Sequence, residues 1–159
     1  MHPDDLDLTD RRILAELQRN GRATNVELSE RVHLSLAQCY RRQKRLEEAG
    51  LIRDFVARLD VGKLGYMAVA FVSMTIANGP CKQPQKFQQA IAGIPEIQEC
   101  RTVTGEADYL LKVVAPDLKA CSSFLMERLT KFFDITNTTS MVSLEELKHS
   151  SALPMRERA

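Results

Sequence analysis

The feature that most constrains this fold is a pair of helix starts separated by a very short turn. In "TNVELSERVHLSLAQCY", Thr24 and Glu27 have the spacing of a capping box, in which a hydroxyl and a carboxylate satisfy free N–H groups at a helix start. Ser35 and Gln38 repeat that spacing directly after the turn "HLS". The pattern predicts two short helices in immediate succession, which is typical of a helix-turn-helix.

A helix before this pair completes a three-helix unit. Thr9 is its expected cap, and "NG" at Asn20 and Gly21 is a left-handed stop signal. The third helix is expected to end at Gly50, after which "LIRDFVARLD" alternates in the manner of a strand or wing. The side chains expected to face inward are Ile13, Leu14, Leu17, Leu28, Val32, Leu36, Cys39, Gln43 and Leu46.

The third helix carries a concentration of positive charge on its outward side. At about 100° per residue its basic residues lie opposite the inward positions, with Arg42 on the border. In a helix-turn-helix this helix enters the major groove of double-stranded DNA, where arginine pairs with guanine and glutamine with adenine. The predicted DNA-binding residues are Ser35, Ala37, Gln38, Arg41, Arg42, Lys44 and Arg45.

Two alternatives stay open for this face. A charged helix side is often only a solvated surface, although two capped helix starts and a tight turn favour the DNA interpretation here. The second alternative concerns Gln38, which either caps the helix or reads a base, because one side chain cannot do both at the same time.

Composition excludes several classes of protein. The net charge of +1 says little about a nucleic-acid partner, so the distribution of charge carries the argument. No apolar run approaches the roughly 20 residues that cross a bilayer, and the acidic start "MHPDDLDLTD" does not look like an export signal. We therefore expect a cytoplasmic protein, associated with the nucleoid and not with a membrane. The four cysteines form no metal-ligand pattern and are expected to be reduced thiols.

The second half is expected to follow the order β-α-β-β-α-β. "YMAVAFVSMTIA" is apolar enough for a strand covered on both sides, and "YLLKVVA" is strongly β-prone. Four strands with two helices on one face form a ferredoxin-like sheet whose other face is bare, so we expect self-association there. The expected elements are a strand over 66–77, a turn over 78–84, a helix over 85–93, strands over 96–104 and 109–115, a helix from 116, and a last strand over 134–147.

The fold class predicted from these patterns is α+β. A helix-turn-helix domain is expected over residues 1–60, a hinge over 61–65, and a ferredoxin-like effector and oligomerisation domain over 66–159.

Four stretches in this order resemble the leucine-responsive regulator and asparagine regulator family of prokaryotic transcription factors, also called feast/famine regulators. They are "LDLTDRRILAELQRNGRATNVELSERV", "RRQKRLEEAGLI", "IPEIQECRTVTGEADYLLKVVAPD" and "MVSLEELK". The resemblance runs from about Leu6 to Leu147. Departures occur at Leu36 and Gln38, where many members have prolines, and at Gln43 and Ala107, so neither operator nor effector preference carries over from relatives.

The resemblance implies a regulator that dimerises through its sheet and assembles further, as a tetramer of dimers. It also implies an effector, typically an amino acid, bound between dimers near "TGEADY". Asp108 would face the ammonium group of that ligand, although Gly105 and Asp108 also suit a plain tight turn. The effector-binding residues implied in this way are Thr104, Gly105, Glu106, Asp108, Thr136, Thr138 and Ser140.

The leading functional prediction is a sequence-specific DNA-binding regulator of amino-acid metabolism or transport, modulated by a small effector. The alternative is a nucleoid-associated architectural protein that wraps DNA without an effector. An enzyme is disfavoured because the three histidines are dispersed and no phosphate loop or catalytic group of residues occurs, so we expect no catalytic residues, metal or cofactor.

Overall fold

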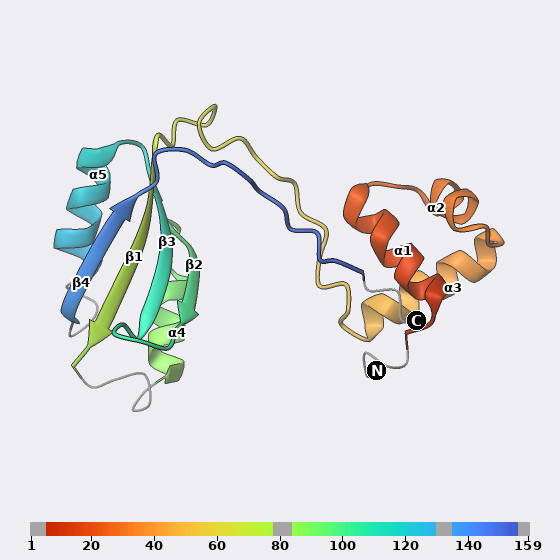
Figure 1. Cartoon of the computed structure of the whole chain (residues 1–159), viewed down its shortest axis with the longest axis horizontal. Helices are drawn as coiled ribbons and strands as arrows, with labels where there is room; N and C mark the ends of the chain where they lie inside the picture. Colours follow the sequence, from red (N-terminus) through yellow and green to blue (C-terminus); the bar gives the residue numbers. More distant parts are fainter. Residues whose placement is uncertain (1–5, 78–83, 130–134, 156–159) are drawn as a thin grey trace. The chain divides into compact units, whose positions relative to one another are not determined.

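The computed structural model describes residues 6–77, 84–129 and 135–155, which form two units (Figure 1). One unit comprises Met1–Arg58 together with Lys148–Ala159, and the other comprises Leu59–Leu147. The sequence interpretation placed the whole of 66–159 in the second domain. By its contacts, the C-terminal segment groups instead with the N-terminal helices.

The first unit contains α1 (Leu8–Arg19), α2 (Asn25–Val32) and α3 (Leu36–Glu48). The predicted cap at Thr9 is wrong, because Asp7 caps α1: its carboxylate accepts the Asp10 N–H at 2.7 Å, and the Asp10 carboxylate accepts the Asp7 N–H. Aspartate is among the strongest capping residues, which starts α1 ahead of the threonine. The predicted left-handed stop at Asn20 and Gly21 is also wrong, since Asn20 has φ −141° and Gly21 is not among the described glycines with positive φ.

The junction of α2 and α3 confirms the paired helix starts. Thr24 and Glu27 form the predicted capping box. His33 ends α2 in a left-handed conformation, with φ 57°, and this reverses the chain for α3. Ser35 caps α3 by accepting the Gln38 N–H at 3.4 Å.

The core of the first unit confirms most of the expected inward positions. Two expected positions are not buried. Leu36, the first residue of α3, is 50% exposed, and Gln43 is only partly buried and donates to the exposed Glu47 side chain. The buried apolar side chains of this unit are Ile13, Leu14, Leu17, Leu28, Val32, Cys39 and Leu46.

The predicted strand or wing in "LIRDFVARLD" is not a strand in this structure. Residues 53–60 have no assigned regular structure, and their apolar side chains, among them Phe55 and Val56, are exposed. A strand needs a partner for its backbone hydrogen bonds, and none of the described strands pairs with this segment.

The second unit confirms the ferredoxin-like order. All its strand pairs are antiparallel, and the order across the sheet is β2-β3-β1-β4. Its elements are β1 (Ala68–Ile76), α4 (Pro84–Ala92), β2 (Ile97–Thr102), β3 (Tyr109–Ala115), α5 (Leu118–Ser123), the π-helical turn η2 (Phe124–Leu129) and β4 (Ile135–Val142).

The sheet is covered on one face. Alternate residues of β1 and β3 pack with Cys121, Phe124 and Leu129 of the second helical segment. Within one chain β1 is covered on one side, and not on both sides as predicted: Phe71 on its other face is 39% exposed and lies opposite the exposed Met141 of β4. The buried strand residues are Ala68, Ala70, Val72, Met74, Tyr109, Leu111, Val113 and Ala115.

The last strand is shorter than predicted. β4 ends at Val142, because its partner β1 begins at Ala68 and the hydrogen bond from the Ser143 N–H to the Val69 carbonyl is the final one between them. The start of the predicted strand at 134 lies outside the described residues, as do most of the predicted turn over 78–84 and Cys81.

The described cysteines Cys39, Cys100 and Cys121 are free thiols, and burial raises the pKa of each. No cluster of metal-ligating side chains occurs among the described residues. Among the helices of the same part of the chain, none is long and apolar enough to cross a bilayer.

Candidate functional sites

The outward side of α3 is solvent-exposed, as the helical period predicts. Ala37, Gln38, Arg41, Lys44 and Arg45 are exposed, while the side chain of Arg42 is only 27% exposed. In the part of the chain that the structure describes, Gln38 makes no side-chain hydrogen bond, so Ser35 alone caps the helix. The amide of Gln38 is therefore not occupied by capping, and it faces solvent.

Two arginines of α3 contact the start of α1. Arg42 Nη1 lies 2.6 Å from Asp7 Oδ2 and 2.8 Å from Asp10 Oδ1, and Arg45 Nη2 lies 2.5 Å from Asp10 Oδ2. The carboxylate of Asp10 is fully buried. We call these four side chains the Asp10 cluster. Its two carboxylates and two guanidinium groups balance in charge.

The Asp10 cluster shifts the pKa values of its members. Partial burial raises the pKa of Asp7, but hydrogen bonds from the Asp10 N–H and from Arg42 outweigh that effect and bring it below its ordinary value. Hydrogen bonds to Asp10 and Asp7 raise the pKa of Arg42. The carboxylate of Asp7 and the guanidinium of Arg42 therefore hold each other in their charged forms.

The other two cations of the run remain outward. Nζ of Lys44 lies 3.7 Å from Oε1 of Glu48. Both side chains are largely exposed, so this ion pair contributes little to stability. Arg41 has no ion-pair partner among the described residues. Of the four positive charges in "RRQKR", Arg41 is thus the one most available to a ligand.

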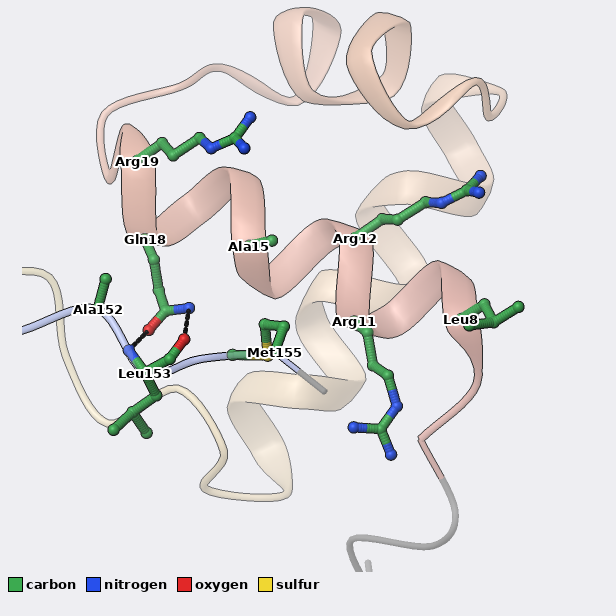
Figure 2. A pocket seen from close by; sticks show the side chains of 9 residues that line it. All are labelled: Leu8, Arg11, Arg12, Ala15, Gln18, Arg19, Ala152, Leu153 and Met155. Carbon is green, nitrogen blue, oxygen red and sulfur yellow. Dashed lines mark hydrogen bonds between the residues drawn. The ribbon is translucent and has the colours of Figure 1, made fainter. Parts of the chain in front are cut away.

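The C-terminal segment lies along α1, a feature that sequence reasoning missed. Figure 2 shows the Gln18 amide bonding the backbone of Leu153 twice: Nε2 donates to the carbonyl at 3.2 Å, and Oε1 accepts the N–H at 2.5 Å. Met155 packs against the helical core. Between the segment and α1 is a hollow of about 360 Å³. It is lined by Leu8, Arg11, Arg12, Ala15, Gln18, Arg19, Ala152, Leu153 and Met155.

This hollow does not have the form of an anion site. Figure 2 shows the side chains of Arg12 and Arg19 extending away from the C-terminal segment, and Arg19 pairs with Glu16. The contacts of Gln18 and Met155 instead attach the segment to the helical unit. No local sequence pattern indicates the Gln18 bonds, because Gln18 and Leu153 are 135 positions apart in the sequence.

The predicted effector loop is hydrogen-bonded to the last residues of β1. Gly105 has φ 121°, a conformation that favours glycine, and so supports the turn interpretation. Asp108 Oδ2 accepts the Ile76 N–H at 3.0 Å, and the Thr75 hydroxyl donates to the Glu106 carbonyl at 3.2 Å. Asp108 therefore organises the loop, and its Oδ1 has no hydrogen bond within the described residues.

The predicted positions on β4 meet the same end of β1. The Thr136 hydroxyl donates to the Thr75 carbonyl at 3.2 Å. Thr138 and Ser140 pair in register with Met74 and Val72, yet they are exposed because β4 is an edge strand. The structure thus brings Asp108 and Thr136 to adjacent residues of β1 and places Thr138 and Ser140 farther along the edge. Thr104 and Glu106 are exposed on the loop.

Two family models match the chain, one for each unit. Residues 6–53 match a winged helix-turn-helix DNA-binding model, and residues 69–153 match the Lrp/AsnC ligand binding domain. The first match contains α1, α2 and α3, and the second contains the four-stranded sheet except Ala68, the first residue of β1.

Relatives and solved structures agree with these matches. The leucine-responsive regulatory proteins of Klebsiella pneumoniae and Escherichia coli K12 are each 41% identical over 154 residues, covering 97% of this chain and 94% of theirs. A Neisseria meningitidis transcriptional regulator solved with L-Met has TM-score 0.87 and 40% identity, with coverage of 94% and 96%. An AsnC family regulator from Agrobacterium tumefaciens has TM-score 0.87 and 34% identity, with coverage of 94% and 97%.

These matches extend over nearly the whole chain and include both the DNA-binding and the ligand-binding unit. The chain belongs to the Lrp/AsnC family of transcriptional regulators.

Proposed function

We propose that this protein binds specific sites on double-stranded DNA through α3 and regulates genes of amino-acid metabolism or transport in response to an amino acid. The observation that carries the proposal is the exposed basic side of α3, which stands on a capped helix-turn-helix in the same chain as a ligand-binding domain of the Lrp/AsnC type. It acts in the cytoplasm, on the nucleoid, and catalyses no reaction.

The DNA contacts come from the outward side of α3 and its capped start. Arg41 and Gln38 have the chemistry to bond base edges, since guanidinium and amide groups form paired hydrogen bonds with guanine and adenine. Lys44 is suited to a phosphate. Ser35 and Ala37 lie at the start of the helix, where backbone approaches the groove. Arg45 shares the outward side, and Arg42 borders it.

The effector contacts come from the loop at the end of β1 and the adjacent edge strand. Asp108 has one oxygen on the Ile76 N–H, which leaves Oδ1 to accept from an ammonium group. The hydroxyls of β4 and the loop are suited to the carboxylate of an amino acid. The proposed contacts are Thr104, Gly105, Glu106, Asp108, Thr136, Thr138 and Ser140.

Self-association is proposed through the open face of the sheet. Phe71 and Met141 lie beside each other there, and both are exposed apolar side chains. Burying such a face against a second copy removes apolar area from water. Dimers then associate further, as a tetramer of dimers, and the amino acid binds between dimers.

A pair of assays tests this function. In the first, each of the twenty amino acids is added at saturating concentration, and the melting temperature is followed. The expected result is a rise for one or a few of them, since a ligand at 100 times its dissociation constant stabilises by about 2.7 kcal/mol. A flat response to all of them would contradict the effector role.

The second assay is footprinting on the DNA upstream of the protein's own gene, with and without the stabilising amino acid. Discrete protected half-sites separated by whole helical turns are expected from a two-fold symmetric regulator. Protection that repeats over long tracts of any sequence would instead support the architectural alternative, in which the protein wraps DNA without base preference.

A further inference from the structure

We propose that Asp10 is a positioning residue for DNA binding: its buried carboxylate holds Arg42 and Arg45 against α1, so that the charge α3 offers to DNA is centred on Arg41. The inference rests on the proposed function of α3 as the DNA-binding helix. It assigns a role to a residue of α1 that the helical pattern of α3 does not reveal.

Burial makes this carboxylate a strong competitor for the two arginines. A charge that is fully removed from water is costly unless it stays paired and hydrogen-bonded. Asp10 meets that requirement through Arg42 at 2.8 Å, Arg45 at 2.5 Å and the Asp7 N–H. If Arg45 turned toward a phosphate, Asp10 would lose half of its charge compensation. A phosphate would therefore have to compete for Arg45 with a carboxylate that is already removed from water.

The spacing along α3 lets two of its arginines share one carboxylate. Arg42 and Arg45 are three residues apart, which places them on neighbouring turns of one helix side. Both reach the same carboxylate of α1. Arg41 lies one turn before Arg45 and has no ion-pair partner among the described residues. Among the described residues, Arg41 therefore has no competing ion pair, whereas Arg42 and Arg45 are already paired with Asp10.

The test compares the salt dependence of DNA binding between the wild-type chain and Asp10→Asn. Asparagine keeps the shape and a hydrogen-bond acceptor but removes the charge that retains Arg45. On a random duplex, where only phosphate contacts count, freeing one cation should steepen the slope of log K against log salt by about 0.9 per bound protomer. Binding at low salt should become several-fold tighter.

Glu96→Gln is the matched control. It also removes one negative charge, together with the ion pair to Arg128, but in the sheet unit. If the control steepens the slope as much as Asp10→Asn does, net charge is the cause and the proposal falls. If Asp10→Asn leaves the slope unchanged or weakens binding, Asp10 does not restrain these arginines, and the proposal is likewise overturned.

A second measurement needs no variant and stays informative if Asp10→Asn fails to fold. Arginine side-chain NMR signals of the wild-type chain are followed while random duplex is added. The signal of Arg41 is expected to shift, and those of Arg42 and Arg45 to stay near their free positions. A shift of Arg45 as large as that of Arg41 would overturn the proposal. Neither measurement depends on operator preference, so a failure of sequence-specific regulation is recognised separately, by equal binding to operator and random DNA.

Discussion

The two candidate sites of this chain are held in place by different kinds of interaction. On α3, the orientation of side chains depends on ion pairs with a buried carboxylate, through Arg42 and Arg45. At the end of β1, Asp108 and Thr136 bind main-chain groups of Ile76 and Thr75. The first arrangement depends on charge and the second on backbone geometry. Changes of charge should therefore affect the helical unit more than the sheet unit.

The largest expected effect follows from removing the buried charge. Asp10→Ala leaves two arginines without their shared partner and removes one half of the α1 capping box. The first unit should lose roughly 2 to 3 kcal/mol of unfolding free energy, because charge-assisted hydrogen bonds to the carboxylate are lost while the arginines left behind stay partly exposed. Denaturant unfolding read by hydrogen exchange in α1 measures this loss.

The control for that change is Glu16→Gln. Glu16 pairs with Arg19 and Arg31, but those arginines are exposed, so less than about 1 kcal/mol should be lost. Equal losses in the two variants would show that burial does not make the ion pairs of Asp10 stronger than those of Glu16. The proposed dependence of the helical unit on a buried charge would then be contradicted.

In the sheet unit, the expected effect depends on hydrogen bonding more than on charge. Asp108→Ala leaves the Ile76 N–H without its acceptor and should cost about 1 to 2 kcal/mol. Asp108→Asn keeps an acceptor and should cost less than half of that, yet it should abolish the melting shift with amino acid. Thermal melts with and without the ligand separate the two roles. If the asparagine variant still responds to ligand, Asp108 serves the loop alone.

A smaller effect is expected from releasing the C-terminal segment. Gln18→Ala removes both hydrogen bonds to Leu153 and should cost about 1 kcal/mol in the first unit. Hydrogen exchange should rise in the segment around Leu153 and stay unchanged in β1. Gln98→Ala, which loses one exposed bond to Pro95, is the control. Unchanged exchange around Leu153 would show that Gln18 does not retain the segment.

The smallest expected effect is on acid stability. The folded pKa of Asp7 is lowered from 3.8, so its contribution is present above that value and is lost as pH falls through the lower, folded value. The melting temperature of the first unit should therefore fall below about pH 4. Asp7→Asn should weaken that dependence while still capping α1. An identical acid profile in this variant would exclude Asp7 as a contributor.

Local sequence patterns predicted the elements well where neighbours in sequence determine them. The capping box of Thr24 and Glu27 needs only residues three apart, and it was confirmed. The cap of α1 was misplaced by two residues, because the apolar spacing of the helix fits a start at either position and the stronger capping preference of aspartate decides for Asp7. The strand predicted for "LIRDFVARLD" failed for a related reason, since alternation says nothing about whether a partner strand is present.

The interactions that distinguish the two sites could not be predicted from such patterns. Arg45 and Asp10 are 35 positions apart, and their pairing depends on how α3 packs against α1. The helical period placed Arg45 correctly on the outward side, yet a long side chain can bend back to a buried carboxylate. In the sheet unit, matching the loop to a known family identified Asp108, but the bond to Ile76 required the structure.

The most direct test of the account is the affinity of Arg41→Ala for its operator and for a random duplex of equal length, at one salt concentration. The expected result is a loss of roughly 1 to 3 kcal/mol on the operator and a clearly smaller loss on random DNA, as for an arginine that reads a base. Wild-type binding that does not distinguish the two duplexes, or an Arg41→Ala variant that binds the operator as tightly as the wild type, would contradict the assignment of α3 as the helix that reads DNA.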